Sequence, residues 1–185
     1  MAGRHVGSVE PDHEHVVLLD ESGKVIGTAL KAEVHTTDTP LHLAFSCYVV
    51  DSDGRVLLTQ RAPAKRTWPG VWTNACCGHP GLDEDLVGAV LRRLTHELGI
   101  RGEVEVTPLL PDFRYRAVMD NGIVENEICP VYTAVTTDVP APSPSEVAEW
   151  AWVEPESLRA SVIATPFAFS PWLGWQLEQA EALAT

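Results

Sequence analysis

The chain has 185 residues, with 26 acidic against 13 basic side chains and a formal net charge of -13. This length predicts one domain with a hydrophobic core, and the acidic balance excludes a general nucleic-acid partner, which needs a basic face. Four cysteines are too few for a disulfide scaffold, and they have no Cys-x-x-Cys spacing. No segment resembles a signal peptide and no run of about 18 apolar residues occurs, so we expect neither export nor a membrane span. We therefore expect a cytoplasmic protein.

The first half of the chain predicts a tail and two hairpins. Residues 1–14 are polar and aperiodic, so we expect a flexible tail before a single domain over residues 15–185. The runs HVVLLD and VIGTA, separated by ESGK, predict a strand, a turn and a strand. LHLAFSCYVVD and RVLLTQR flank Asp53-Gly54 and predict a second hairpin.

The stretch TNACCGHP, residues 73–80, contains the adjacent cysteines Cys76 and Cys77. Such a pair can be a disulfide, part of a metal site, a reactive nucleophile or two small apolar plugs. A disulfide between neighbouring cysteines closes a strained and rare ring. The other three interpretations stay open on these residues alone.

The hydrophobic period becomes helical after residue 83. Asp83 can cap the start of this helix and Gly99 can end it. Its apolar stripe consists of Val87, Val90, Leu91, Leu94 and Leu98.

The remaining chain predicts a third hairpin and a last helix. FRYRAVMD and IVENEICPVYTAV flank Asn121-Gly122, a strong hairpin turn, and PAPSPSE predicts a stiff surface loop. EWAWVE predicts a further strand, and Ser170-Pro171 predicts the cap and first turn of the final helix. We therefore expect an α/β (α+β) domain of mixed, mostly antiparallel sheets packed with helices.

The predicted helix and the glycine before it resemble the Nudix box. A glycine, five residues, a glutamate and seven residues precede the run RRLTHELGI, which keeps the box at Gly78, Glu84, Arg92, Glu97 and Gly99. Two glutamates of the box are replaced by Arg93 and His96, which should weaken hydrolysis because Nudix hydrolases use clustered glutamates to gather magnesium on a diphosphate. Taken alone, these charges could also be a solvated helix face.

Five further side chains suit a first-row divalent metal. His35 and His42 flank a short loop, and His79 follows the cysteines. Strand alternation places Glu125 and Glu127 on one face, where two carboxylates repel each other unless a cation or proton lies between them. Singly, each histidine is more often a surface or hydrogen-bonded side chain, and the spacing alone does not bring the three together.

Five segments in order resemble the type I isopentenyl-diphosphate isomerases, namely HTTDTPLHLAFS, WPGVWTNACCGHP, PDFRYRA, VENEICPV and TPFAFSPW. They extend from residue 35 to residue 172, most of the chain. The resemblance implies a Nudix-like fold and the interconversion of isopentenyl and dimethylallyl diphosphate by protonation and deprotonation of the alkene through a tertiary carbocation. It also implies an isoprenoid diphosphate as the small-molecule partner, and we expect a monomer, with an oligomer left open.

The resemblance assigns roles residue by residue. The implied catalytic residues are Cys77, Glu127, Tyr115 and Trp172. The implied diphosphate-binding residues are Lys31, Arg61, Lys65 and Arg93. The implied metal ligands are His35, His42, His79, Glu125 and Glu127 for one divalent ion, which could be Mn²⁺, Zn²⁺ or Mg²⁺, and Glu97 for a Mg²⁺ ion on the diphosphate.

Three rival interpretations stay open at this point. A Nudix hydrolase is disfavoured by Arg93 and His96. A silent metal or diphosphate-binding protein would need no acid and base pair, yet Cys77 and Glu127 are present. A thiol redox protein could form a Cys76–Cys77 disulfide, but the ring that it closes is strained and rare.

Overall fold

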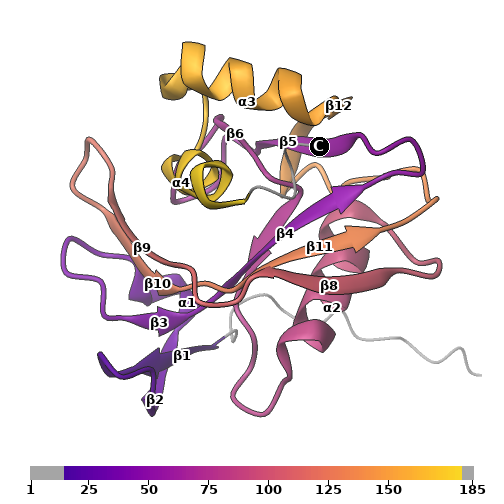
Figure 1. Ribbon diagram of the computed structural model, residues 1–185. Coiled ribbons are helices and arrows are strands. Elements are labelled where there is room, and N and C mark those ends of the chain that lie inside the picture. The colour runs from indigo at the N-terminus through magenta and orange to yellow at the C-terminus, as the bar shows by residue number, and fades with distance from the viewer. Residues whose placement is uncertain (1–14, 181–185) are drawn as a thin grey trace, which may run out of the picture.

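The computed structural model describes residues 15–180, which form two β-sheets flanked by helices (Figure 1). The tail expected over residues 1–14 lies outside the described residues, as do the last five residues of the expected domain. Within the described part of the chain, the helices are too short or too polar to cross a membrane.

The smaller sheet has the strand order β2-β1-β3-β10-β9. The first expected hairpin is confirmed as the antiparallel pair β1 and β2, and the Asn121-Gly122 turn joins the antiparallel pair β9 and β10. Gly122 has a φ of 84°, which explains the glycine at this turn. The strands are β1 (His15–Leu19), β2 (Val25–Leu30), β3 (His42–Leu43), β9 (Arg114–Val118) and β10 (Val124–Ile128).

The larger sheet has the order β12-β5-β4-β11-β8, with two short strands paired to β5 and β4. The expected Asp53-Gly54 turn is present, but β4 and β5 pair only at Val50 and Val56, because most of β4 pairs with β7 and β11. The strands are β4 (Phe45–Val50), β5 (Val56–Arg61), β6 (Trp72–Thr73), β7 (Cys76–Gly78), β8 (Glu105–Leu110), β11 (Val131–Val135) and β12 (Val147–Val153).

Two segments of the chain pass from the smaller sheet into the larger one. Residues 42–50 form β3 and then β4, and residues 124–135 form β10 and then β11. The two segments run parallel in both sheets, with Glu127 opposite His42 in the smaller sheet and Val131 opposite Ser46 in the larger. This crossing places a predicted metal ligand from each segment side by side.

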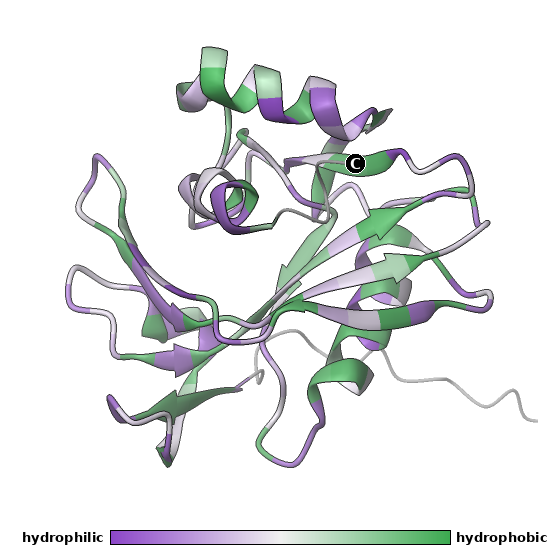
Figure 2. Ribbon diagram, viewed as in Figure 1, coloured by the Kyte–Doolittle hydropathy of each residue, from purple (hydrophilic) through white to green (hydrophobic). Residues whose placement is uncertain are grey.

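Helices cover the two faces of the larger sheet. In Figure 1, α2 lies on one face and α3 and α4 lie on the other, and Figure 2 shows the central strands between them mostly in hydrophobic or neutral colours. Strand alternation explains this arrangement, since Cys47 packs in the core with Leu94 of α2 while Tyr48 packs with Leu173 of α4. The helices are α1 (Lys31–Val34), α2 (Leu86–Leu98), α3 (Pro155–Ala164), the 3₁₀ turn η2 (Pro166–Ala168) and α4 (Pro171–Gln179).

The helix termini correct two expectations. Asp85, not Asp83, caps α2, because the helix begins at residue 86 and the Asp85 side chain accepts a hydrogen bond from the Gly88 amide. Gly99 ends α2 as expected, with a φ of 67°. Ser170 is the N-cap residue of α4, but its hydroxyl contacts Thr73 Oγ1 at 2.8 Å rather than the helix.

Candidate active site

A cavity of about 340 Å³ brings together most of the predicted site residues. It lies where the two sheets meet, beside α1, α2 and the start of α4. One group of lining residues is cationic and another carries the thiol, carboxylates, imidazoles and an indole. The predicted residues on its wall are Lys31, His35, Arg61, Lys65, Cys77, His79, Arg93, Glu125, Glu127 and Trp172.

Three histidines and one glutamate form a compact cluster. His35, His42, His79 and Glu127 each offer a ligand atom, and these atoms all lie within 4.8 Å of one another. Two buried imidazole nitrogens, His35 Nε2 and His79 Nδ1, lack a hydrogen-bond partner, and His42 Nε2 has only the Glu127 carboxylate, at 3.3 Å. Orphaned nitrogens beside a carboxylate fit a divalent first-row metal, whose bond would satisfy them.

The electrostatics of this cluster favour neutral imidazoles at His35 and His79 beside an ionised Glu127 carboxylate. Burial, reinforced by His79, lowers the pKa of His35 to about 3, and burial also lowers the pKa of His79. Burial would lower the pKa of His42 as well, but the hydrogen bond and charge of Glu127 outweigh it and raise that pKa. Burial opposes ionisation of Glu127, yet His42 and His79 hold its pKa well below the usual range.

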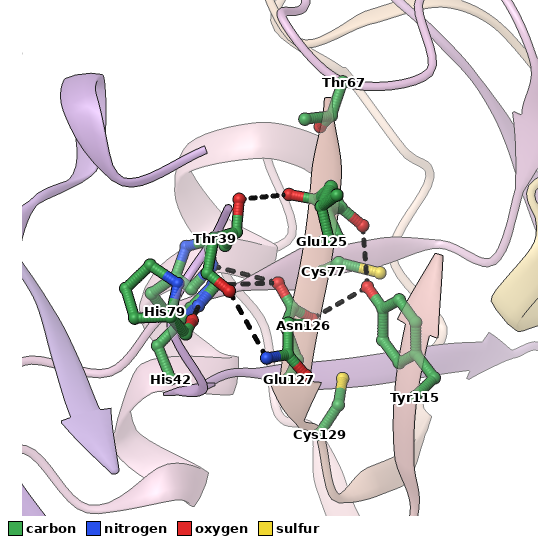
Figure 3. A network of polar contacts seen from close by, with 12 residues as sticks. Thr39, His42, Thr67, Cys77, His79, Tyr115, Glu125, Asn126, Glu127 and Cys129 are labelled. Carbon is green, nitrogen blue, oxygen red and sulfur yellow. Dashed lines mark hydrogen bonds and ion pairs between the residues drawn. The ribbon is translucent and has the colours of Figure 1, made fainter. Parts of the chain in front are cut away.

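Glu125 was expected to be a metal ligand, but it lies outside the four-residue cluster. It alternates with Asn126 on β10, and its carboxylate accepts a hydrogen bond from the Tyr115 hydroxyl at 2.7 Å. The same hydroxyl contacts Glu127 at 2.8 Å, so Tyr115 joins the two carboxylates (Figure 3). Burial and the charge of Glu127 raise the pKa of Glu125, which is the repulsion expected for two carboxylates on one strand face.

The two adjacent cysteines face opposite sides of β7. Cys76 is 2 % exposed and packs in the core beneath α2, whereas Cys77 lines the cavity. All four cysteines are free, so the disulfide interpretation is not supported. Burial raises the pKa of Cys77 to about 12, which keeps it a neutral thiol. Its sulfur lies 3.3 Å from Ser46 Oγ and 3.5 Å from Asn74 Oδ1.

Aromatic rings enclose the thiol side of the cavity. Trp172 is 1 % exposed and packs with Tyr115 at 5.6 Å between ring centroids and with Trp68 at 5.3 Å, edge to face. The backbone bond between Ser170 N and Trp72 O, at 2.9 Å, fixes the start of α4 and hence Trp172. Trp68 has a φ of 41°, an unusual conformation for a side chain of this size.

Two cations of the cavity, Arg93 and Lys65, are already paired with carboxylates. Arg93 is 4 % exposed and donates to Glu97 at 2.6 Å, and its guanidinium also lies 3.5 Å from Glu146. Lys65 forms an ion pair with Glu146, and burial lowers the pKa of Lys65 to about 8. Diphosphate oxygens could exchange with these carboxylates, because Arg and Lys bind both groups by the same charged hydrogen bonds.

The Nudix-like residues have local structural roles. A side chain at Gly78 would place its Cβ 3.0 Å from Arg93 Cγ and Phe45 Cζ, so close packing of β7 on α2 explains the glycine. Glu84 accepts two hydrogen bonds from Arg92 at 2.7 Å and one from the Gly81 amide. Of the box carboxylates, Glu97 therefore lies nearest the cationic residues of the cavity.

Sequence reasoning missed three residues of this site. Ser46 and Asn74 contact the Cys77 sulfur, and Glu146 contacts Lys65. Asn74 stands inside the conspicuous TNACCGHP stretch, three residues before Cys77, which was an available signal. Glu146 is 49 residues from Glu97 in sequence and lies in the loop that we expected to be only a surface connection, so no local pattern indicated it.

Comparison with known sequences gives consistent matches. A NUDIX domain family model matches residues 40–173. The chain is 58 % identical over 166 residues to the isopentenyl-diphosphate Delta-isomerase of Paenarthrobacter aurescens, covering 90 % of each chain. It is 57 % identical over 177 residues to the protein of the same name in Corynebacterium diphtheriae, covering 94 % of this chain and 96 % of the relative.

Solved structures share the fold at lower identity. A protein of Deinococcus radiodurans aligns with a TM-score of 0.72 and 19 % identity, over 90 % of this chain and 99 % of the other. A MutT protein of Methanosarcina mazei Go1 aligns with a TM-score of 0.61 and 19 % identity, over 79 % and 96 % of the two chains. The two-sheet architecture is therefore a Nudix fold.

Proposed function

This chain belongs to the isopentenyl-diphosphate Delta-isomerase family of Nudix-domain proteins, and we propose how its cavity performs the reaction of that family. The enzyme interconverts isopentenyl and dimethylallyl diphosphate, a reaction of isoprenoid biosynthesis. One observation carries the proposed mechanism: a single cavity has five Lys and Arg side chains among its lining residues and also Cys77, Glu127 and Trp172.

The cations bind the diphosphate in this mechanism. Lys31, Arg61, Lys65 and Arg93 line one cavity and offer the charged hydrogen bonds that hold phosphate oxygens. Glu97, beside Arg93, would hold the Mg²⁺ that accompanies the diphosphate. A local cluster of this kind binds an anion on a protein of net charge -13, because distant surface charges are screened by salt.

The thiol and the Glu127–Tyr115 pair exchange protons with the hydrocarbon. A proton adds to the terminal methylene carbon of isopentenyl diphosphate and leaves a tertiary carbocation. A proton then leaves the carbon that lies between the tertiary cation and the diphosphate-bearing methylene group, its C–H electron pair forms the new double bond, and the atoms balance. Cys77 and Glu127 both line the cavity and each can transfer a proton, and the Tyr115 hydroxyl contacts the Glu127 carboxylate at 2.8 Å.

The histidine cluster holds a divalent metal in this proposal. His35, His42, His79 and Glu127 would be its ligands, with Glu125 connected to the set through Tyr115. The bound ion would supply positive charge that stabilises the Glu127 carboxylate. Mn²⁺, Zn²⁺ and Mg²⁺ all remain candidates for this position.

Aromatic residues protect the carbocation from water. The Trp172 face offers the best side-chain surface for a cation, worth about 2 kcal/mol when desolvated. Trp68 and Tyr115 pack against Trp172 and exclude solvent from the same region. Exclusion matters because water would capture the intermediate before the second proton transfer.

Isotope incorporation tests the function directly. The protein is incubated with Mg²⁺ and isopentenyl diphosphate in deuterated water, and deuterium in the dimethylallyl diphosphate product is the expected result. A Nudix hydrolase would instead release phosphate, so phosphate is measured in parallel and is expected to stay at background. Phosphate release without isomerisation would reject the proposal. The expected cytoplasmic location and monomeric state stay predictions.

A further inference from the structure

The Asn74 side chain has a single possible orientation. It is fully buried between β6 and β7, and its amide nitrogen donates to Cys47 O at 3.0 Å and to Cys76 O at 2.9 Å. A flipped amide would point its oxygen at two carbonyl oxygens and lose both bonds. The two backbone carbonyls therefore fix the direction in which Oδ1 points.

Oδ1 of Asn74 faces two residues of the proposed mechanism. It accepts a hydrogen bond from Trp172 Nε1 at 3.2 Å and contacts Cys77 Sγ at 3.5 Å, and Thr73 Oγ1 donates to it at 3.0 Å. An indole N–H can only donate and an amide oxygen can only accept, so the thiol donates its proton in this contact. One oxygen thus links a side chain of β7 to a side chain of α4.

We propose that Asn74 is a positioning residue for the isomerisation, acting through the shared contact of its Oδ1 with Cys77 and Trp172. This inference rests on the proposed function. The thiol is held on a second side by Ser46 Oγ, which itself accepts from Gln176 Nε2 at 3.0 Å. Between Asn74 and Ser46, the sulfur has a defined place on the cavity wall.

The positioning matters because the proton is transferred to the same small hydrocarbon on which the positive charge develops. Cys77 must reach a carbon atom while the Trp172 face lies against the developing charge. A misplacement of about 1 Å in a catalytic group lowers rates by about 10²-fold. A common anchor keeps the distance between thiol and indole constant, which two independent anchors would not.

A purely structural role for Asn74 makes a different prediction. Its two donated bonds tie β4 to β7, so their loss would lower stability whatever Oδ1 does. Thr59 provides a matched control, since its hydroxyl donates to Asn74 O at 2.9 Å and Ala75 O at 3.3 Å. Thr59→Val removes a buried tie to the same segment and leaves Oδ1 in place.

The test compares Asn74→Ala, Asn74→Asp and Thr59→Val by melting temperature, KM and kcat. Asn74→Ala should lower kcat about 100-fold with KM within about threefold of wild type, because the diphosphate residues are untouched. Thr59→Val should lower the melting temperature and keep kcat. Asn74→Asp keeps an acceptor oxygen, and a buried carboxyl that faces two carbonyl oxygens stays protonated and can donate to one of them, so its kcat should stay within about tenfold of wild type.

Two outcomes would overturn the inference. One is a folded Asn74→Ala protein with wild-type kcat. The other is an Asn74→Asp protein that melts above the assay temperature yet is as slow as the Ala variant, because the role would then belong to the donated bonds. Asn74→Asp still decides the question if Asn74→Ala does not fold, since low activity in a folded Asp variant rejects the role of Oδ1. Wild-type protein inactive in the same assay would instead reject the proposed function.

Discussion

Successive side chains of β7 point to opposite faces of the strand, so the neighbouring Cys76 and Cys77 should have different functions. Cys77→Ala should lower kcat by about 10³-fold or more, because it removes a group that exchanges a proton with the alkene. Cys76→Val should keep most of the activity, since this side chain packs in the core beneath α2, away from the cavity. Steady-state kinetics of both variants check the assignment. Equal losses would show that Cys77 has no special role.

Deprotonation of Lys65 should lower the activity of the enzyme at alkaline pH. Burial lowers its pKa to about 8, so the cation that binds diphosphate is present below pH 8 and is lost above it. The pH dependence of kcat/KM reports groups of the free enzyme, and it should therefore fall about tenfold between pH 7 and pH 9.

Lys65→Arg is the matched variant for this pH effect. Arginine stays charged throughout the range, so the alkaline fall should disappear while activity at pH 7 changes less. The same fall in Lys65→Arg, or a flat profile in the wild type, would assign the limit to another group. The groups that surround Lys65 electrostatically are Lys31 on α1, Arg61 on β5, and Arg93 and Glu97 on α2, with Glu146 paired to it directly.

At the scale of elements, the C-terminal end of α2 supports the loop that carries Glu146. The Ala141 amide donates to Leu98 O and the Ser143 amide to Glu97 O, both at 2.8 Å. Glu146 follows in the same segment and reaches Lys65. The end of the helix thus helps to position the carboxylate that pairs with a diphosphate-binding cation.

A substitution at Gly99 tests the contact between the end of α2 and the loop that carries Glu146. Its φ of 67° and the Ala141 oxygen, 2.7 Å from the place of a Cβ, both disfavour a side chain. Gly99→Ala should lose about 1–2 kcal/mol of stability from the left-handed conformation alone, and the melting temperature should fall by several degrees. Gly174→Ala in α4 is the control, because a Cβ there meets only Val162 Cγ1 at 3.7 Å and alanine favours the helix. Equal melting temperatures for the two variants would contradict the argument.

Local sequence patterns predicted individual helices and strands better than they predicted which strands pair with one another. The hairpin at Asn121-Gly122 and the end of α2 at Gly99 depend on backbone conformations that glycine permits, so they could be read directly. The helix α3 was not expected, and IVENEICPVYTAV was expected to be one arm of a hairpin. It divides between two sheets after Cys129, because its second half pairs with β4 and β8 instead of β9.

At the scale of the whole molecule, the candidate metal site depends on contacts distant in sequence. His35 follows α1, His42 is in β3, His79 follows β7, and Glu127 is in β10. Their residue types suggested a metal, but only the parallel pairing of β3 with β10 and the placement of β7 beside β4 bring them together. Strand alternation correctly predicted that Glu125 shares a face of β10 with Glu127, but Glu125 lies outside the four-residue cluster, which alternation could not predict.

A ligand set drawn from both sheets should couple metal binding to the stability of the entire fold. A ligand that binds only the folded state at 100 times its Kd adds about 2.7 kcal/mol, which for a chain of this size raises the melting temperature by about 5–10 °C. We expect this rise when metal-free protein receives Zn²⁺ or Mn²⁺, and its reversal by a chelator. Comparing Zn²⁺, Mn²⁺ and Mg²⁺ at equal concentration ranks the candidate ions.

His42→Ala and His15→Ala separate specific binding from general effects. His42 is fully buried in the cluster, so its loss should abolish most of the metal-induced rise, whereas His15 is exposed on β1 and its loss should preserve the rise. The pH dependence provides a second check: Glu127 raises the pKa of His42, and a metal must displace the proton that His42 binds below that pKa. The metal-induced rise should therefore shrink as the pH falls from 8 to 6. A full rise in His42→Ala, or one independent of pH, would place the metal elsewhere.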